Sequence, residues 1–405
     1  MSKRIALLAT VAVTAAGLAV SAATASSTKH SVKASSHLLV GLNDEAFTLY
    51  GDPTSAFATL KTLKTQVIRV NLYWGGTKWA VAKSRPTDPT DPGDTAYDWA
   101  IYDRLVRYAT QYNIKVVFSI LFTPGWANGG KARTTAPKNF KDLQNFAYAA
   151  AERYSGLWTP PVWQQDPSNP TTELPLPKVS MWTAWNEPNN PIWLSPQYKR
   201  IGKTWRVESA YQYARICNAI YNGVHTPGLA LTGEKVACGV TGPKGNDAPT
   251  TSRPSVDPLT FLSAAHRYGM KKFDVYAHHP YANAGNESPS YVPKGAQKRR
   301  VQMGNLGLLT TLLTKYYGPK HLWITEYGYQ SNPPDKTIFG TSLAKQALWM
   351  KQAYAMARKN PRIDMMLWFL VRDEANIKTG WQSGLETIRG KKKPAWNTFR
   401  SLPRG

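Results

Sequence analysis

Cysteine is scarce in this chain. Only 2 of its 405 residues are cysteines, Cys217 and Cys238. Two are too few for a disulfide-framework fold or a Cys-rich zinc module. They could pair in an oxidising compartment, or they could be two small apolar residues of the core. The sequence leaves both readings open.

Acidic residues are also scarce. The chain has 25 Asp and Glu against 50 Lys and Arg, which gives a net charge of +25 although only 19% of its residues are charged. The bases are scattered apart from small clusters at residues 298–300 and 391–393, and no nucleic-acid-binding motif is present. We interpret the second cluster as a solvated loop. The charge favours an anionic cell-wall polymer or an acidic polysaccharide as a partner, and we expect no nucleic acid.

Long hydrophobic runs are absent beyond the N-terminus. Residues 5–20 are uncharged and mostly apolar; they follow Lys3 and Arg4 and precede the small residues Ala23-Thr24-Ala25. This pattern predicts a secretory signal peptide over residues 1–25 and a flexible lead-in over residues 26–37. An uncleaved anchor is the alternative, but the run is shorter than the ~20 residues of a membrane span. We expect a secreted, extracellular protein without a transmembrane segment, associated with the cell wall if the charge acts as suggested.

From residue 38 onward, strand-like runs alternate with helical ones. Short segments rich in β-branched and aromatic residues are separated by segments with apolar residues at spacings of three and four. The helices are predicted at residues 55–63, 97–112, 139–154, 209–221, 258–268, 303–317, 343–358 and 395–402. The strands are predicted at residues 38–43, 66–73, 115–122, 178–185, 229–236, 273–279, 321–327 and 363–371.

Eight strand–helix units predict an α/β fold, a (β/α)8 TIM barrel that forms a single catalytic domain over residues 38–405. An open doubly wound sheet shows the same alternation. However, no G-x-G-x-x-G turn follows the first strand, which weakens that alternative.

Two glutamates stand where predicted strands end. Glu187 lies in Trp-Asn-Glu-Pro-Asn after the fourth strand, and Glu326 lies in Thr-Glu-Tyr-Gly at the end of the seventh. In a barrel both would point into the mouth. Cleavage of a glycosidic bond needs such a pair, because one carboxylic acid protonates the leaving oxygen while the other attacks or activates water. A single Glu is usually a solvated charge, but one flanked by Trp-Asn and Pro on a buried strand is not typical of that.

These two motifs resemble those of the large barrel clan of retaining glycoside hydrolases, with the cellulase-like family 5 and the xylosidase-like family 39 nearest. The resemblance extends over nearly all of the chain after residue 38. It implies that Glu187 is the acid/base and Glu326 the nucleophile. It also implies that Asn186 holds the sugar 2-hydroxyl.

Further residues match the same clan. Arg69 on strand two resembles the arginine that braces the nucleophile, and D-V-Y-A-H-H-P-Y on strand six resembles the clan's D-x-x-S-x-H-x-Y. The match assigns Tyr281 as a hydrogen-bond donor to the nucleophile and His279 as a sugar contact or an organising residue. His278 is interpreted as a packed core imidazole. A vicinal His pair can also bind metal, but no Cys or Asp lies at ligand spacing, so we expect neither metal nor cofactor.

Several tryptophans are predicted to stack on sugar rings. Trp368 on strand eight resembles the clan's aromatic platform, and Trp74, Trp126, Trp185 and Trp193 lie on or beside the loops at the barrel mouth. Each could instead be a core residue.

The chain departs from family 5 because no His lies between His37 and His225. The family and its substrate are therefore not assigned. The sequence predicts a secreted retaining O-glycoside hydrolase that cleaves a poly- or oligosaccharide, expected to be a monomer. A transglycosylase with the same Glu pair and a non-catalytic carbohydrate- or wall-binding barrel are the alternatives. The sugar, the linkage and endo or exo action are not determined by the sequence.

Overall fold

The computed structural model describes residues 38–165, 170–226 and 232–404. The predicted signal peptide and lead-in lie outside these residues. The described residues all belong to one unit, Val32–Gly405. Within the described ranges, no helix has the length and apolar composition that crossing a membrane requires.

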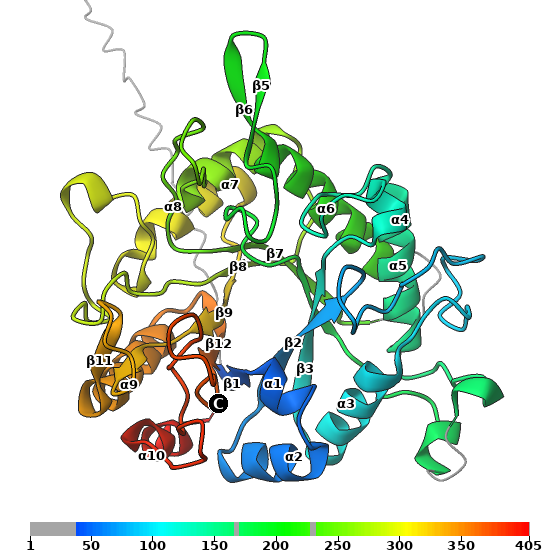
Figure 1. The fold of residues 1–405 in the computed structure, drawn as a ribbon, viewed down its shortest axis with the longest axis horizontal. Helices are drawn as coiled ribbons and strands as arrows, with labels where there is room; N and C mark the ends of the chain where they lie inside the picture. Colours follow the sequence, from blue (N-terminus) through cyan, green and yellow to red (C-terminus); the bar gives the residue numbers. More distant parts are fainter. Residues whose placement is uncertain (1–37, 166–169, 227–231, 405) are drawn as a thin grey trace, which may run out of the picture. The chain divides into compact units, whose positions relative to one another are not determined.

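Eight parallel strands close into a barrel (Figure 1). Closure is achieved by β1 (Leu39–Asn43), which pairs with both β2 (Val67–Tyr73) and β12 (Ile363–Phe369). Between them, in order, are β3 (Lys115–Leu121), β4 (Met181–Ala184), β7 (Lys235–Thr241), β8 (Val275–His278) and β9 (Leu322–Tyr327). The predicted (β/α)8 barrel is therefore confirmed, and the open sheet is excluded.

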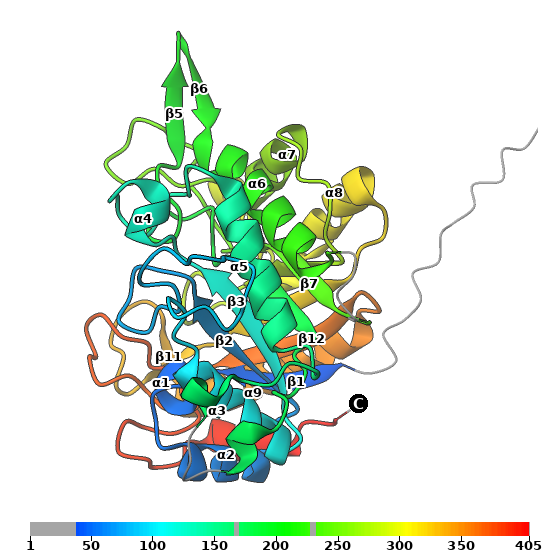
Figure 2. The same ribbon diagram turned by 90° about the vertical axis from the view of Figure 1, so that its right-hand side faces the viewer.

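Helices cover the outside of the barrel (Figures 1 and 2). The larger ones are α2 (Pro53–Thr62), α3 (Ala100–Gln111), α5 (Phe140–Arg153), α6 (Glu208–Val224), α7 (Pro258–Arg267), α8 (Gly307–Tyr317), α9 (Leu343–Lys359) and α10 (Pro394–Ser401). The short ones are α1 (Glu45–Thr48), α4 (Gly125–Asn128) and the 3-10 turns η1 (Val162–Gln164), η2 (Pro170–Glu173), η3 (Gly295–Gln297) and η4 (Met303–Asn305). Two small additional sheets pair β5 (Tyr198–Ile201) with β6 (Thr204–Val207) and β10 (Gln330–Asn332) with β11 (Gly340–Ser342).

Side-chain caps explain where several helices begin. The side chain of Asn139 accepts a hydrogen bond from Lys141 N before α5, and Ser342 caps α9 in the same way. Asp257 caps α7, where Pro258 occupies the first turn. These residues satisfy backbone N–H groups that have no partner within the helix.

The core has two layers that follow the period of two along each strand. Val67, Val117, Met365 and Leu367 belong to the cluster that fills the barrel, whereas alternate residues such as Ile68 pack outward against the helices. Away from irregularities such as the register shift at Gly239–Thr241 in β7, the direction of a strand residue therefore follows from its parity with these neighbours.

The fifth strand lies further along the chain than predicted. The prediction was residues 229–236, whereas β7 is Lys235–Thr241, and residues 229–231 are outside the described residues. Gly239 within β7 reads as a turn residue, but it has φ +87° and the Tyr276 ring lies 2.3 Å from where its Cβ would be. The strand therefore needs a glycine for close approach, and that glycine hides the strand in the sequence.

The two cysteines form a disulfide. Cys217 of α6 and Cys238 of β7 have their Cα atoms 5.9 Å apart. This resolves the question that the sequence left open, and it ties an outer helix to a barrel strand.

Candidate active site

Glu187 and Glu326 meet at the carboxyl ends of the barrel strands. Glu187 follows β4 and Glu326 lies in β9, and one oxygen of each carboxylate lies within 4.8 Å of the other and of a ring nitrogen of His279. Their side chains are 16% and 13% exposed. The backbone N–H of Glu187 donates to the Val240 carbonyl at 2.8 Å, which fixes the turn that presents its carboxylate.

Arg69 and Tyr281 hold Glu326. Arg69 Nη1 lies 2.5 Å from Glu326 Oε1, and the Tyr281 hydroxyl donates to Glu326 Oε2 at 3.1 Å. Arg69 is 1% exposed and also donates to Ser119 Oγ and Asn186 Oδ1, both at 2.7 Å. Burial, followed by the charge of Glu326, holds the pKa of Tyr281 well above its usual value, so its hydroxyl remains a donor. The Glu326 carboxylate is therefore fixed by a guanidinium on one oxygen and a hydroxyl donor on the other.

His279 lies between the two glutamates. Its Nδ1 is 3.1 Å from Glu187 Oε1 and 3.7 Å from Glu326 Oε2, and its Nε2 is 2.9 Å from Thr325 Oγ1. The ring is fully buried. The structure thus places Arg69, Asn186, His279 and Tyr281 around the glutamate pair.

His278 points away from this group. It is buried, with Nδ1 2.8 Å from Thr241 Oγ1 and Nε2 3.0 Å from the Val301 carbonyl. Burial lowers its pKa to about 3, so the ring is neutral. The interpretation of His278 as a core imidazole is confirmed.

The spacing of Glu187, His279 and Glu326 also suits a metal ion. However, a metal would share Glu326 with the permanently charged guanidinium of Arg69, and the two cations would repel. We therefore assign no metal to these residues.

The glutamates line a cleft of about 940 Å³. Aromatic rings form much of its wall. They are Phe47, Tyr50, Tyr73, Trp193, Tyr281, Tyr329, Phe339, Phe369 and Trp381. The sequence predicted aromatic residues at the barrel mouth, although most of the rings that line the cleft are not those it named.

Trp368 is not the predicted sugar platform. Met365 and Leu367 of β12 point into the barrel, so Trp368 points outward, where it is fully buried and its Nε1 donates to the Ser383 carbonyl at 2.8 Å. Its neighbour Phe369 has the inward parity and lines the cleft. The core interpretation of Trp368 is the right one.

Trp74 and Trp126 also lie outside the cleft lining. Trp74 has the outward parity after β2 and is fully buried against Phe146, with ring centroids 5.9 Å apart. Trp126 is partly buried, donates to the Ala82 carbonyl at 3.1 Å and lies 4.5 Å beneath the Arg85 guanidinium. The prediction of sugar contacts for these two residues is therefore wrong. Parity counted from Arg69 would have selected Asn71 and Tyr73.

Trp185 and Trp193 divide in the same way. Trp185 is fully buried and its Nε1 donates to the Trp193 carbonyl at 2.8 Å, whereas Trp193 lines the cleft.

Glu45 is a cleft residue that the motifs did not identify. Its carboxylate accepts hydrogen bonds from Asn71 N at 2.6 Å and from the Tyr73 hydroxyl at 2.7 Å, and burial raises its pKa. The nearby Asn71 Oδ1 is buried without a donor. Glu45 could have been found from the sequence, because the polar run Asn43-Asp44-Glu45 stands at the end of the first strand, where barrel enzymes place site residues.

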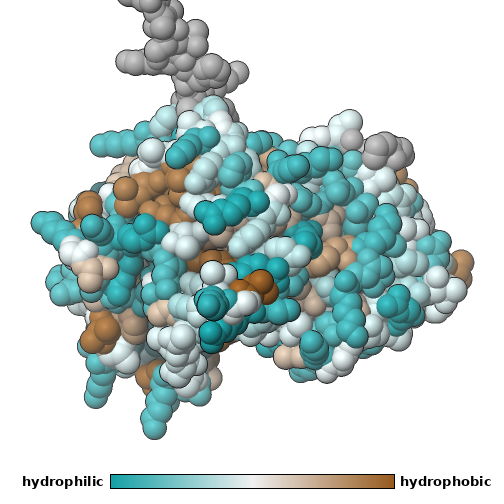
Figure 3. Space-filling model, turned by 90° about the horizontal axis from the view of Figure 1, so that it is seen from above, coloured by the Kyte–Doolittle hydropathy of each residue, from teal (hydrophilic) through white to brown (hydrophobic). Residues whose placement is uncertain are grey.

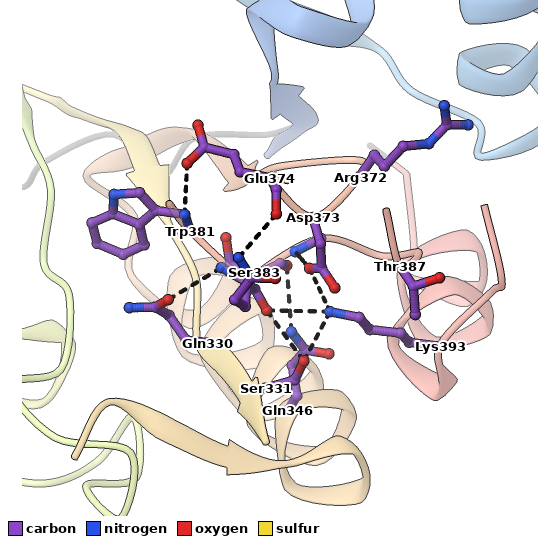
Figure 4. Close-up of polar contacts among 12 residues, drawn as sticks. Gln330, Ser331, Gln346, Arg372, Asp373, Glu374, Trp381, Ser383, Thr387 and Lys393 are labelled. Atoms are coloured by element: carbon purple, nitrogen blue, oxygen red, sulfur yellow. Dashed lines mark hydrogen bonds and ion pairs between the residues drawn. The ribbon is translucent and has the colours of Figure 1, made fainter. Parts of the chain in front are cut away.

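The loop after β12 forms one wall of the cleft. Figure 4 shows the polar contacts that hold this loop in place. Lys393 Nζ lies 2.6 Å from Asp373 Oδ1 and donates to Ser331 Oγ at 2.8 Å and to the Gln382 carbonyl at 3.2 Å. Lys393 is therefore a buried anchor and not part of a solvated cluster. Burial lowers its pKa, and Asp373 opposes that shift. The anchored loop carries Trp381 into the cleft.

Asp44 attaches the same loop to β1. Its carboxylate caps α1 through Phe47 N at 3.0 Å and accepts from Val371 N at 2.9 Å and Arg372 N at 3.1 Å. Burial outweighs these hydrogen bonds and raises its pKa to about 6. Asp44 thus joins the segment after β1 to the loop after β12, so the wall of the cleft is continuous where the first and last strands meet.

Residues 244–404 match a family of unknown function, DUF5722. A comparison with curated proteins finds no match. Many solved structures do match, at low sequence identity.

Three of these structures are glycosidases by their descriptions. A family 39 glycoside hydrolase from Bacteroides cellulosilyticus has 15% identity and a TM-score of 0.57, over 90% of this chain and 63% of that one. A glucosidase from Croceicoccus marinus has 13% identity and a TM-score of 0.61, over 91% and 67%. GH5_18 from Bifidobacterium longum has 12% identity and a TM-score of 0.54, over 91% and 79%. The predicted resemblance to families 5 and 39 is thus confirmed at the level of the fold, and the chain spans less than two thirds of the family 39 relative.

Proposed function

We propose that this protein is a retaining glycoside hydrolase in which Glu187 and Glu326 carry the chemistry. The observation that carries the proposal is their separation, with carboxylate oxygens within 4.8 Å. Retaining enzymes hold their two carboxyl groups about 5–5.5 Å apart, whereas inverting enzymes need about 6.5–9.5 Å to admit a water molecule. The fold shared with glycosidases supports the same reaction class.

The environments of the two glutamates support different roles. Glu326 is held by a cation and a hydroxyl donor, which suits a carboxylate nucleophile. Among the described residues, the Glu187 carboxylate has His279 and, at 3.5 Å, Asn190 as hydrogen-bond partners and forms no contact with a guanidinium or an ammonium group, so it suits a group that gives and takes a proton.

The reaction then proceeds in two displacements. Glu326 attacks the anomeric carbon while Glu187 protonates the departing oxygen, and a covalent glycosyl–enzyme forms. Glu187 next removes a proton from water, whose oxygen attacks the same carbon and releases Glu326. Asn186, fixed by Arg69, is placed to hold a sugar hydroxyl beside the nucleophile.

Secretion is part of the proposal. The basic N-terminus followed by an apolar run and Ala-Thr-Ala supports export. The Cys217–Cys238 disulfide supports an oxidising destination, because such bonds persist outside the cytosol.

The test is a panel of aryl glycosides and plant and microbial polysaccharides. Glu326→Gln should abolish turnover on every substrate, whereas the exposed control Asp98→Asn should leave it unchanged. Glu187→Ala should retain activity only on activated aryl glycosides. With added azide it should form a glycosyl azide that keeps the anomeric configuration of the substrate, because azide needs no general base. Full activity of Glu326→Gln would contradict the assignment.

The same panel separates the alternatives. A transglycosylase would lengthen oligosaccharides without releasing reducing ends, and a binding barrel would show saturable binding with no turnover on any member.

A further inference from the structure

A two-stranded hairpin projects from the loop that follows Glu187 (Figures 1 and 2). It consists of β5 and β6, joined by Gly202 and Lys203. All seven residues 199–205 are exposed, including Ile201 at 46% and Trp205 at 43%. Nothing in the barrel requires such an extension, and an exposed tryptophan on a projecting ribbon is typical of a contact surface.

The hairpin carries only positive charge. Its ten residues include Lys199, Arg200, Lys203 and Arg206 and no acid. Arg206 is engaged, because it pairs with Glu208 at 2.6 Å and stacks on Tyr211. Among the described residues, the other three form no ion pair, and the Arg200 guanidinium reaches only the Gly202 carbonyl at 3.2 Å. Lys199, Arg200 and Lys203 are therefore available to pair with an anionic group of another molecule.

The register places one cation beside the tryptophan. Arg200 pairs directly with Trp205, so their side chains lie on the same face of the ribbon. Ile201 pairs with Thr204 and lies on the opposite face, and the tip is glycine and lysine. Tyr198 and Val207 share the Trp205 face but pack against the core at the base of the hairpin. Insertion into a membrane would need an apolar tip or an extended, exposed apolar face, and the exposed part of this ribbon has neither.

The surroundings are also hydrophilic. Figure 3, viewed from the side on which the hairpin projects, shows hydrophilic side chains over most of this face and only scattered hydrophobic patches. A ring that stacks on a sugar, next to a guanidinium that pairs with a carboxylate, fits this setting.

We propose that the hairpin is a binding site for an anionic polysaccharide, in which Trp205 stacks on a sugar ring and Arg200 pairs with an adjacent carboxylate. The polymer is an anchor and not the substrate. The cleft is lined by Asp44, Glu45, Glu187, Glu326, Asp373 and Glu374 against only Lys244 and Arg372, so it disfavours a polyanion. Binding at the hairpin therefore does not depend on the proposal that the cleft hydrolyses glycosides.

Binding is measured without turnover. The inactive Glu326→Gln protein is run through native gels that contain polygalacturonate, and its retardation gives an apparent Kd. Arg200→Ser and Trp205→Ala should each weaken binding at least fivefold. The matched controls are Arg400→Ser on α10 and Trp163→Ala on η1, which remove an exposed arginine and an exposed tryptophan elsewhere and should change Kd less than twofold. Fully methyl-esterified polygalacturonate, which keeps the backbone and lacks the charge, should bind at least tenfold more weakly.

Other outcomes overturn the proposal. Equal losses in the hairpin variants and the Arg400→Ser control would assign binding to net charge. Retention on phosphatidylglycerol vesicles without retardation by polygalacturonate would identify a membrane contact. Unchanged Kd in both hairpin variants would show that the hairpin is not the site. In the active background the hairpin variants should keep their rate on aryl glycosides, so failure of the anchor and failure of the hydrolase assignment are distinguishable.

Discussion

At the scale of single residues, Arg69 organises most of the candidate site. The buried Arg69 guanidinium, which projects from β2, contacts Ser119 on β3, Glu326 on β9 and Asn186 after β4. It therefore sets the positions of groups that come from three other parts of the barrel. The planar fork makes these contacts simultaneous, which an ammonium cannot do.

Arg69→Lys should therefore lower kcat/KM by about 10²-fold even though the charge is kept, a loss comparable to removal of one donor from a preorganised site. The measurement is steady-state kinetics on the best aryl glycoside of the panel, with the melting temperature recorded alongside. A variant with wild-type kinetics would show that charge alone is sufficient at this position.

His278 supplies a prediction about pH. Its pKa is about 3 in the folded protein and 6.5 in the unfolded chain, so the unfolded state binds the proton more readily between these values. Stability from the neutral ring is present above pH 6.5 and is lost as the pH falls towards 3. Between pH 7 and pH 4.5 the loss is of the order of 3 kcal/mol.

His278→Gln should remove this loss. Urea unfolding at the two pH values should show a smaller decrease in the unfolding free energy for the variant than for the wild-type protein. Equal decreases would mean that the ring is protonated in the folded state or that it does not remain buried.

At the scale of elements, hydrophobic periodicity predicted the positions of helices and strands, whereas the conformations of the loops could not be predicted from the sequence. The eight predicted helices and seven of the eight strands match observed elements closely, because the apolar spacing that buries a face is local in sequence. Strand β7 was misplaced because Gly239 serves close packing against Tyr276, a contact between different strands.

The motifs of the candidate site were local as well, so the residues that the structure brings together could be selected from the sequence. They are Glu187, Glu326, Arg69, Asn186, His279 and Tyr281. The aromatic wall could not. Trp368 and Phe369 are adjacent, and only the parity of β12 determines which one lines the cleft. Trp381 reaches the cleft through contacts between loops that are distant in sequence.

The Lys393 anchor gives a prediction at this scale. The Asp373 side chain is only 1% exposed, so Lys393→Met should leave a buried carboxylate without its partner. The unfolding free energy should fall by about 3–5 kcal/mol. The loop that carries Trp381 should loosen, so KM should rise more than kcat falls. The double variant Lys393→Met with Asp373→Leu should recover much of the stability, since no unpaired charge remains. Failure to recover would show that the ion pair is not the cause of the loss.

At the scale of the whole molecule, charge is distributed unevenly. The chain carries a net charge of +25, yet acids outnumber bases among the cleft-lining residues. The sequence-based expectation of an anionic cell-wall polymer or an acidic polysaccharide as a partner suits the outer surface, whereas the acidic lining disfavours such a polymer as an occupant of the cleft.

The cleft should therefore prefer uncharged sugars. The best aryl glycoside of the panel should have a kcat/KM at least tenfold above that of the analogue whose C6 is a carboxylate, as follows from repulsion by like charges. Glu374→Gln, which removes one rim charge, should narrow this gap, and added salt should narrow it too. An equal or better rate on the carboxylate analogue would contradict the charge argument.

The pairing of Leu39 with Met365 has a consequence for the order of events during synthesis. The first strand of the barrel cannot complete its pairing before the last strand is made, so the sheet keeps open edges until residues 363–369 have left the ribosome. Contacts that span so much sequence form slowly because a long loop must first be closed. The barrel of a nascent chain therefore stays open until β12 has been synthesised, and a C-terminal truncation before Ile363 should yield an aggregation-prone product rather than a smaller folded barrel.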